Sequence, residues 1–321
     1  MHSFEQLSDK FSQYFKAPHF PASPASLYDP AGYFLNMGGK RIRPVLCLMG
    51  NELFEEIHAN AWDAAAAVEL FHNFSLIHDD IMDKAPLRRG KETLHMRYGE
   101  NTAILAGDVM LVAAYERINR ISGAMLPQVL QLFNTTAREV CEGQQLDIDY
   151  EKQEQVAMED YLRIIELNTS VLLAASLMMG AILGGAGERN QQLVYQFGKK
   201  LGLAFQVQDD YLDAFGDPAK FGKQVGGDIL ANKKTFLLIH ALANTNSAQR
   251  KTLQRLMAGK SDDKVERVIA LFRECGVDAW ALELKNRFLD EALQHLEDVA
   301  VLSKRKEPLK ALAQFLVQRE V

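Results

Sequence analysis

Two Asp-Asp-x-x-Asp segments constrain this chain more than any other sequence feature. Each lies in an apolar, helix-like stretch, the first from Phe71 to Met82 and the second from Leu203 to Phe215. Because residues four apart share one face of an α-helix, each segment would present a patch of clustered carboxylates. The acidic residues of the two segments are Asp79, Asp80, Asp83, Asp209, Asp210 and Asp213.

Carboxylates clustered on an apolar stretch need a counter-charge. They repel one another and desolvation adds to the cost, so a bound cation relieves both penalties. All the candidate ligands are oxygens, which favours Mg2+ or Mn2+ over zinc or copper. Mg2+ shares its sites with phosphate oxygens, so two facing patches would form a cradle for a diphosphate. A single such segment is more often a solvated acidic helix end, but its repetition favours the metal site.

Composition indicates an ordinary globular protein. With 321 residues, 48% hydrophobic and 24% charged, the chain can bury a full core as one large domain or two smaller ones. We interpret residues 1–321 as a single domain. The net charge of -6 argues against nucleic acid as a partner. Cys47, Cys141 and Cys275 are widely spaced and in no paired pattern, which predicts a reduced, cytoplasmic environment.

One stretch could cross a membrane by its length. Asn168 to Gly187 has no charged side chain, but it is rich in Ala, Ser and Gly. A span at this point would also separate the two Asp segments across a bilayer. We therefore expect a buried central helix followed by a loop, with no transmembrane segment. Met1 to Lys16 is too acidic and amphipathic for a signal peptide.

The remaining pattern predicts an all-α fold without β-strands. Ala17 to Pro30 contains four prolines and is interpreted as a loop. Apolar residues then recur with helical spacing in long stretches, and the residues beyond Asn246 form further amphipathic helices. The expected helices are Ala61–Met82, Asn101–Ile121, Pro127–Asp147, Met158–Leu183, Asn190–Phe215 and Thr235–Leu242.

Basic residues flank both acidic segments. Lys40 and Arg43 follow a glycine pair, Arg88 and Arg89 follow the first segment, and several lysines follow the second. Arg offers a bidentate fork for phosphate and Lys a point charge. Each basic run alone is more often a solvated turn, but their positions beside the carboxylates favour phosphate binding. His72 and Gln206 lie seven residues before Asp79 and Asp213, on the same helix faces, although a lone His is often only structural.

These motifs together resemble the trans-polyprenyl diphosphate synthase family, in particular the short-chain farnesyl and geranylgeranyl diphosphate synthases. Gly-Gly-Lys-Arg-Ile-Arg-Pro, Leu-Ile-His-Asp-Asp-Ile-Met-Asp with Leu-Arg-Arg-Gly, and Phe-Gln-Val-Gln-Asp-Asp-Tyr-Leu-Asp occur in the family's order and spacing, from about residue 37 to 242. The resemblance implies a helical bundle around a deep cavity, usually as a homodimer, with helices 262–319 in the same domain. It also implies three Mg2+ ions, replaceable by Mn2+, and isopentenyl and allylic diphosphates as substrates.

The resemblance also implies roles for individual residues. Asp79, Asp83 and Asp209 would be direct metal ligands, supported by the other three acidic residues. The diphosphate of isopentenyl diphosphate would be held by Lys40, Arg43, His72 and Arg89. The allylic diphosphate would be held by Arg88, Lys223 and Lys233. Thr169 and Gln206 match further positions of the family's pocket.

Product length is expected to depend on the helix before the first acidic segment. Phe74 lies five residues before Asp79, about 7 Å along the axis, and Ser75 beside it is small. The family resemblance implies that a bulky residue at this position forms a floor that stops chain elongation, so we expect C15 to C20 products. The alternative is that Phe74 packs in the core and Leu70 or Phe71 closes the tunnel.

One position departs from the family pattern. Asn168 precedes Thr169 where the family commonly has Lys, and Asn cannot neutralise phosphate charge. A class I terpene cyclase shares the first acidic segment, but its usual second motif and its lack of a Gly-Gly-Lys-Arg-x-Arg-Pro site do not match this chain. A non-catalytic subunit of a heteromeric synthase would usually have an eroded acidic segment, whereas both are intact here.

Overall fold

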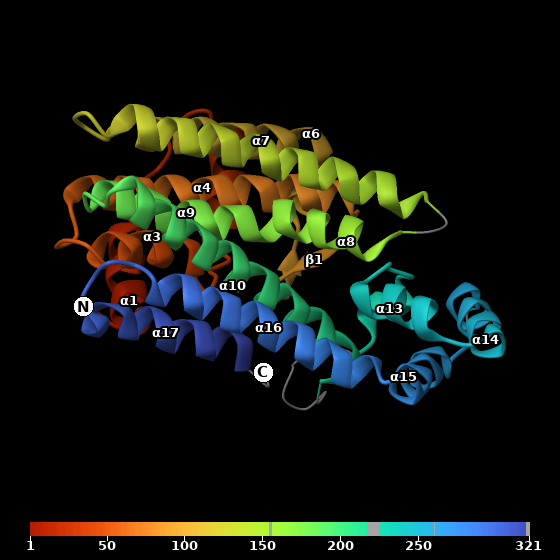
Figure 1. Ribbon diagram of the computed structural model, residues 1–321. Coiled ribbons are helices and arrows are strands. Elements are labelled where there is room, and N and C mark those ends of the chain that lie inside the picture. Colours follow the sequence, from red (N-terminus) through yellow and green to blue (C-terminus); the bar gives the residue numbers. More distant parts are fainter. Residues whose placement is uncertain (154–155, 217–224, 260, 319–321) are drawn as a thin grey trace. The chain divides into compact units, whose positions relative to one another are not determined.

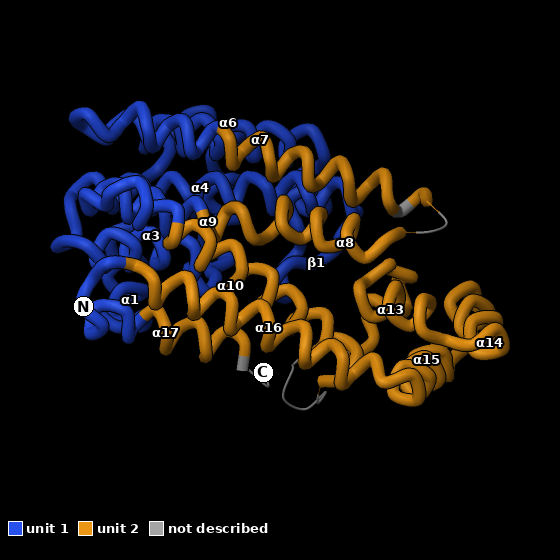
Figure 2. The backbone as a smooth tube through the Cα atoms, viewed as in Figure 1, with its two compact units in different colours: residues 1–134, 175–192, 300–308 blue, residues 135–174, 193–299, 309–321 orange. Residues whose placement is uncertain are grey.

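The computed structural model describes residues 1–153, 156–216, 225–259 and 261–318. Within these residues the protein is built almost entirely of helices, so the predicted all-α class is confirmed (Figure 1). The chain divides into two compact units (Figure 2). Unit 1 comprises residues 1–134, 175–192 and 300–308, and unit 2 comprises residues 135–174, 193–299 and 309–321.

Unit 1 contains the N-terminal helices and the first acidic segment. Its central pair is α4 (Ala59–Met82) and α6 (Glu100–Ile118), and α3 (Ile42–Glu52) packs against α4. Ala64 to Ala67 are fully buried on α4, which allows this close packing. Before residue 135 the chain also forms α1 (Phe4–Tyr14), α2 (Ala25–Leu35), β1 (Leu87–Arg88), β2 (Lys91–Glu92), α5 (Leu94–Tyr98) and the first part of α7 (Leu126–Glu151).

Unit 2 contains the second acidic segment, on α10 (Glu188–Phe215), which begins in unit 1. The helix α9 (Val171–Leu183) begins in unit 2 and continues into unit 1, and a π-helical turn, η1 (Glu166–Ser170), precedes it. The remaining elements of unit 2 are α8 (Met158–Ile165), α12 (Gly227–Leu230), α13 (Phe236–Asn244), α14 (Ser247–Ala258), α15 (Lys264–Glu274) and α16 (Val277–Glu297). The last helix, α17 (Ser303–Gln318), begins in unit 1 and continues into unit 2.

Two expectations from the sequence require correction. The proline-rich stretch is not a loop throughout, because α2 begins at Ala25 and carries Pro30 inside it. Burial of Pro30, Ala31 and Phe34 offsets the hydrogen bond that the proline cannot donate. The chain also has a two-stranded antiparallel ribbon, in which Arg88 pairs with Lys91, so the first acidic segment is followed by a short hairpin.

The apolar stretch that begins near Asn168 is largely a core segment. The helical run Met158–Leu183 is long and apolar enough to cross a membrane, but 78% of its most apolar window is buried inside the protein. Such burial is typical of a central helix, as the sequence predicts.

Close helix contact in unit 1 gives a stability prediction. A Cβ added at Gly180 of α9 would overlap the backbone carbonyl of Cys47 on α3, which cannot move easily. We expect Gly180→Ala to lower the free energy of unfolding by about 1–3 kcal/mol, measured by urea denaturation. Gly32→Ala is the matched control, because nothing lies within 4 Å of its added Cβ and the helix gains stability. Equal stability of the two variants would contradict this packing.

Candidate functional site

The first acidic segment lies at the end of α4. Asp79 is half-buried and Asp83, the residue that caps the helix, is exposed. Asp80 is only 1% exposed, because the guanidinium of Arg88 on β1 covers it. Arg88 Nε donates to both carboxylate oxygens, at 2.8 and 2.9 Å, and Nη2 approaches Oδ1 at 2.8 Å. The hairpin is therefore anchored to the acidic segment by a multidentate ion pair.

The glycine-rich loop before α3 brings the predicted basic residues of unit 1 together. Gly38 and Gly39 have φ values of 81° and 148°, and Arg41, which caps α3, has φ of 51°. The Arg89 guanidinium lies against Gly39 so closely that a Cβ there would come within 2.9 Å of Nη2. Glycine at this position therefore allows the hairpin and the loop to meet.

Arg43 and His72 form the inner part of this group. Nη1 of Arg43 donates to Nε2 of His72 at 3.0 Å. Burial lowers the pKa of His72 well below 6.5, and the nearby arginines lower it further, so the imidazole is neutral and accepts this bond. Burial also lowers the pKa of Arg43 to about 10, and its covered Nε has no hydrogen-bond partner in the structure. A buried cation favours a nearby anion that offsets its charge.

Glu69 and Asn73 of α4, which the sequence did not single out, organise this group. Arg41 donates to the Oε1 of Glu69 on α4, and Glu69 is 3% exposed. Asn73 Nδ2 donates to the same oxygen at 2.9 Å. The buried Glu69 also opposes the charges of Arg43 and Arg89. Its position three residues before His72, on the same helix face, is the only sequence signal that could have revealed it.

In unit 2, the second acidic segment lies within α10. Asp210 is 6% exposed, and its two oxygens accept hydrogen bonds from the Tyr161 hydroxyl of α8 and from Gln206 Nε2, the latter at 2.8 Å. Burial raises the pKa of Asp210 to about 7, although the hydrogen bonds from Tyr161 and Gln206 lower it. Tyr161 is a functional candidate that sequence reasoning missed, because 49 residues separate it from Asp210.

The pocket positions implied by the resemblance join this network. Thr169 Oγ1 donates to Gln206 Oε1 at 3.3 Å, so Thr169, Gln206 and Asp210 are linked in a chain of hydrogen bonds. Thr169 lies in the π-helical turn η1, a feature frequent at functional sites. Asn168, in the same turn, is packed against Gly143 of α7, and its covered Oδ1 has no hydrogen-bond partner.

The remaining acidic residues have different surroundings. Asp209 is half-buried, and burial raises the pKa of Asp213. An oxygen of Asp213 accepts a hydrogen bond from the backbone N–H of Asp228 at 3.0 Å, which holds the start of α12. Lys233 Nζ lies 3.4 Å from Asp228. Lys223 lies outside the described residues, so its role stays a prediction.

The predicted floor residue Phe74 is half-buried on α4. Its ring meets His78 edge-on with centroids 4.7 Å apart, and it lies 5.6 Å from the ring of Phe71. Phe71 is 1% exposed and Leu70 fully buried, so of these three side chains Phe74 has the accessible surface. Ser75 Oγ donates to the carbonyl of His72 at 3.0 Å.

The residues present fit a Mg2+ site that is completed by a substrate. Within the described part of the chain, no three His, Cys, Asp or Glu side chains form a metal-binding group on their own. Mg2+ typically takes only one or two carboxylates and completes its shell with water and phosphate oxygens. The accessible carboxylates of Asp79 and Asp83, one helical turn apart, suit such binding.

Comparison with known proteins agrees with this geometry. Residues 24–275 match the family described as polyprenyl synthetase. A short chain isoprenyl diphosphate synthase of Methanocaldococcus jannaschii is 41% identical over 77% of this chain and 76% of its own length. A crystal structure of geranylgeranyl pyrophosphate synthase is 42% identical, with a TM-score of 0.95 over 100% of both chains. Polyprenyl synthase from Caulobacter crescentus CB15, complexed with calcium and isoprenyl diphosphate, is 27% identical, with a TM-score of 0.87 over 99% of this chain and 97% of that one.

The match covers most of the chain and includes both acidic segments, the Gly-Gly-Lys-Arg loop and the two arginines of the hairpin. The chain therefore belongs to the polyprenyl synthetase family and is a prenyltransferase of the short-chain prenyl diphosphate synthase type.

Proposed function

We propose that this enzyme condenses isopentenyl diphosphate head-to-tail (1'-4) with a C5, C10 or C15 allylic diphosphate to give an all-trans C15–C20 prenyl diphosphate. Members of the family generally use Mg2+ and these two classes of substrate. The observation that carries the proposal is the covered, unpartnered Nε of Arg43, next to neutral His72 on the helix that ends in the first acidic segment. This arrangement leaves an anion site within reach of carboxylates suited to a metal.

The group in unit 1 would bind isopentenyl diphosphate without a metal. Arg43 and Arg89 would supply charged donors for its phosphate oxygens, and exposed Lys40 a further charge. His72 stays neutral and fixes the Arg43 guanidinium by accepting one N–H. These residues would thus hold the diphosphate while its double bond remains free to react.

The allylic diphosphate would be bound by the acidic segments through Mg2+. Asp79, Asp83 and Asp209 would be direct ligands of three ions, for which Mn2+ can substitute, and Asp80, Asp210 and Asp213 would hold them in position. The polyprenyl synthase of Caulobacter crescentus CB15 crystallised with calcium, also a divalent cation, and isoprenyl diphosphate, which supports this chemistry. When bound, Mg2+ would stabilise the charge that develops on the leaving diphosphate.

The protein's own groups would complete the reaction. Lys233 and Lys223, and Arg88 beside Asp80, would lie near the leaving diphosphate as further cations. The resulting allylic cation would be attacked by the double bond of isopentenyl diphosphate, and the released pyrophosphate would take the proton. No side-chain nucleophile is needed, and Thr169 and Gln206 would shape the pocket.

The enzyme would be a cytoplasmic homodimer without a transmembrane segment. None of the three cysteines, all within the described residues, forms a disulfide, which supports a reducing compartment. The faces of α5 and α6 carry large exposed apolar side chains that a second copy would cover, namely Met96, Ile104, Leu105 and Val112.

The test is turnover by the purified chain with Mg2+, isopentenyl diphosphate and, in separate reactions, the C5, C10 and C15 allylic diphosphates. Mass spectrometry should find linear C15 or C20 diphosphates. Hydrocarbons formed from an allylic diphosphate alone would instead indicate a cyclase. No product with any starter would indicate a non-catalytic subunit and contradict the proposal.

Arg43→Ala should raise KM for isopentenyl diphosphate by about 10- to 150-fold, because it removes charged hydrogen bonds to the substrate. KM for the allylic diphosphate should change little. The exposed Arg138, on α7, provides the matched control Arg138→Ala, which should leave both constants unchanged. Equal increases in the two KM values for Arg43→Ala would mean that Arg43 does not bind isopentenyl diphosphate specifically.

A further inference from the structure

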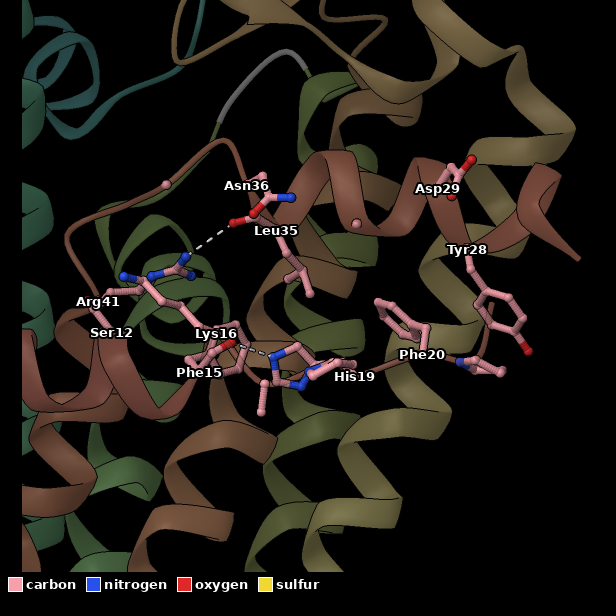
Figure 3. A pocket seen from close by; sticks show the side chains of 15 residues that line it. Ser12, Phe15, Lys16, His19, Phe20, Tyr28, Asp29, Leu35, Asn36 and Arg41 are labelled. Atoms are coloured by element: carbon pink, nitrogen blue, oxygen red, sulfur yellow. Dashed lines mark hydrogen bonds between the residues drawn. The ribbon is translucent and has the colours of Figure 1, made fainter. Parts of the chain in front are cut away.

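A pocket lies in unit 1, outside the acidic segments. It has a volume of about 520 Å³ and lies between the end of α1, the segment that follows it and α2 (Figure 3). This volume lies within the range of small-molecule sites. All the lining residues belong to positions 12–41, so the pocket is formed entirely within this unit.

The two ends of the pocket differ in chemistry. Arg41, Lys16 and Asn36 lie toward one end, and Phe20 and Tyr28 toward the other (Figure 3). The rings of Phe20 and Tyr28 stack with centroids 5.8 Å apart and form an aromatic wall. Asp29, the acidic residue of the lining, is exposed and lies at the Tyr28 end, away from Arg41 (Figure 3). A ligand with one anionic and one apolar end matches this polarity.

The cationic end is built from a fixed guanidinium. Arg41 stacks over the Phe15 ring at 5.3 Å and donates from Nη2 to the carbonyl of Leu35 at 3.2 Å. Nη1 donates to Glu69, so two of the five N–H groups of the guanidinium make these bonds. The remaining N–H groups can serve an oxyanion, and exposed Lys16 adds a mobile charge.

His19 adds a polar wall without adding charge. Its Nε2 donates to the carbonyl of Phe15 at 2.9 Å (Figure 3). Its Nδ1 accepts from Arg117 at 3.3 Å. Both ring nitrogens are thus used by the protein, and burial lowers the pKa of the imidazole. The anion-binding capacity of the pocket therefore lies at Arg41 and Lys16.

We propose that this pocket is an effector site for a small anionic amphiphile, with a phosphate or carboxylate head on Arg41 and Lys16 and an apolar tail against Phe20 and Tyr28. Two sources share this chemistry, short isoprenyl phosphates and fatty acids. Ligand binding at this pocket does not depend on the proposed function, whereas its effect on the isopentenyl diphosphate site rests on that function.

Occupancy of the pocket is coupled to the isopentenyl diphosphate site through the glycine-rich loop. Gly38 and Arg41 line the pocket and flank Lys40, and both have positive φ. Arg41 also holds Glu69, the carboxylate that opposes the charge of Arg43. A head group on the remaining N–H groups of Arg41 weakens the Arg41–Glu69 ion pair by sharing its charge, so it loosens the loop that carries Lys40 and weakens binding of isopentenyl diphosphate.

Binding is tested by calorimetry with geranyl phosphate and with decanoate, which contain the same number of carbon atoms, each in EDTA to exclude metal-dependent binding at the acidic segments. At least one probe should bind. Gly32→Leu should weaken binding tenfold or more, because Gly32 lines the pocket and nothing lies within 4 Å of its added Cβ. Lys16→Ala should also weaken it, and the control Lys10→Ala, on α1 and outside the pocket lining, should not. The tighter probe identifies the source.

Absence of binding by both probes, or equal binding by wild type and both pocket variants, would overturn the proposal. Circular dichroism checks folding, and Lys16→Ala decides the outcome if Gly32→Leu does not fold. In the coupled assay, a saturating probe should raise KM for isopentenyl diphosphate about fivefold or more in wild type but not in Gly32→Leu. Binding without turnover would refute the proposed function alone, and turnover without binding would refute the effector site alone.

Discussion

Asp79→Asn is expected to lower kcat by about 100- to 1,000-fold, the effect of removing one group that stabilises transition-state charge. The substitution keeps the size of the side chain but removes a charge that we assign to Mg2+. Because Asp79 is half-buried at the end of α4, the amide can replace the carboxylate without a new cavity. Steady-state rates across a Mg2+ titration measure the effect, and the Mg2+ concentration for half-maximal rate should rise.

The control for this substitution is Asp9→Asn on α1, which changes the net charge equally at an exposed position. Its kcat and Mg2+ dependence should match the wild type. Both variants should retain the wild-type melting temperature without Mg2+. A loss of less than threefold for Asp79→Asn would remove this residue from the metal site, whatever the fate of the other carboxylates.

The sequence predicted best where one local pattern decides the structure. The helix expected at 61–82 is observed at 59–82, because an apolar stripe defines its face and Pro86 prevents its continuation. The same reasoning failed for α2, where the prolines suggested a loop. Pro30 is tolerated inside α2 because the apolar face of the helix, which includes Phe34 and Leu35, is buried against the rest of the protein. Such tertiary packing has no local signal in the sequence.

The residues of the candidate site also differ in how far the sequence could group them. Residues on one helix face, such as His72 and Asp79, could be grouped from their spacing. The Tyr161–Asp210 bond and the Arg41–Glu69 ion pair each join segments far apart in the chain, so only the fold reveals them. For Arg88, spacing suggested a substrate contact, whereas the structure also gives it an ion pair with Asp80.

Phe74→Ala should shift the main product from C15–C20 to C25 or longer. Phe74 is half-buried one turn and a half before Asp79, with its ring edge-on to His78. Removing the ring would leave Ser75, a small residue, and open the tunnel along α4 to the growing chain. Mass spectrometry of products from a C15 starter measures the change, and the overall rate should fall far less than for Asp79→Asn.

Two matched variants separate a floor from ordinary packing at Phe74. Ser75→Phe should shorten the product by placing a second ring beside Phe74. Phe71→Leu should lower stability with little change in product length, because Phe71 is 1% exposed and packs against Phe133 with centroids 5.4 Å apart. If Phe74→Ala leaves product length unchanged while Phe71→Leu extends the product, the floor lies one turn deeper, at the buried ring of Phe71. The exposed surface of a side chain would then not identify the residue that stops elongation.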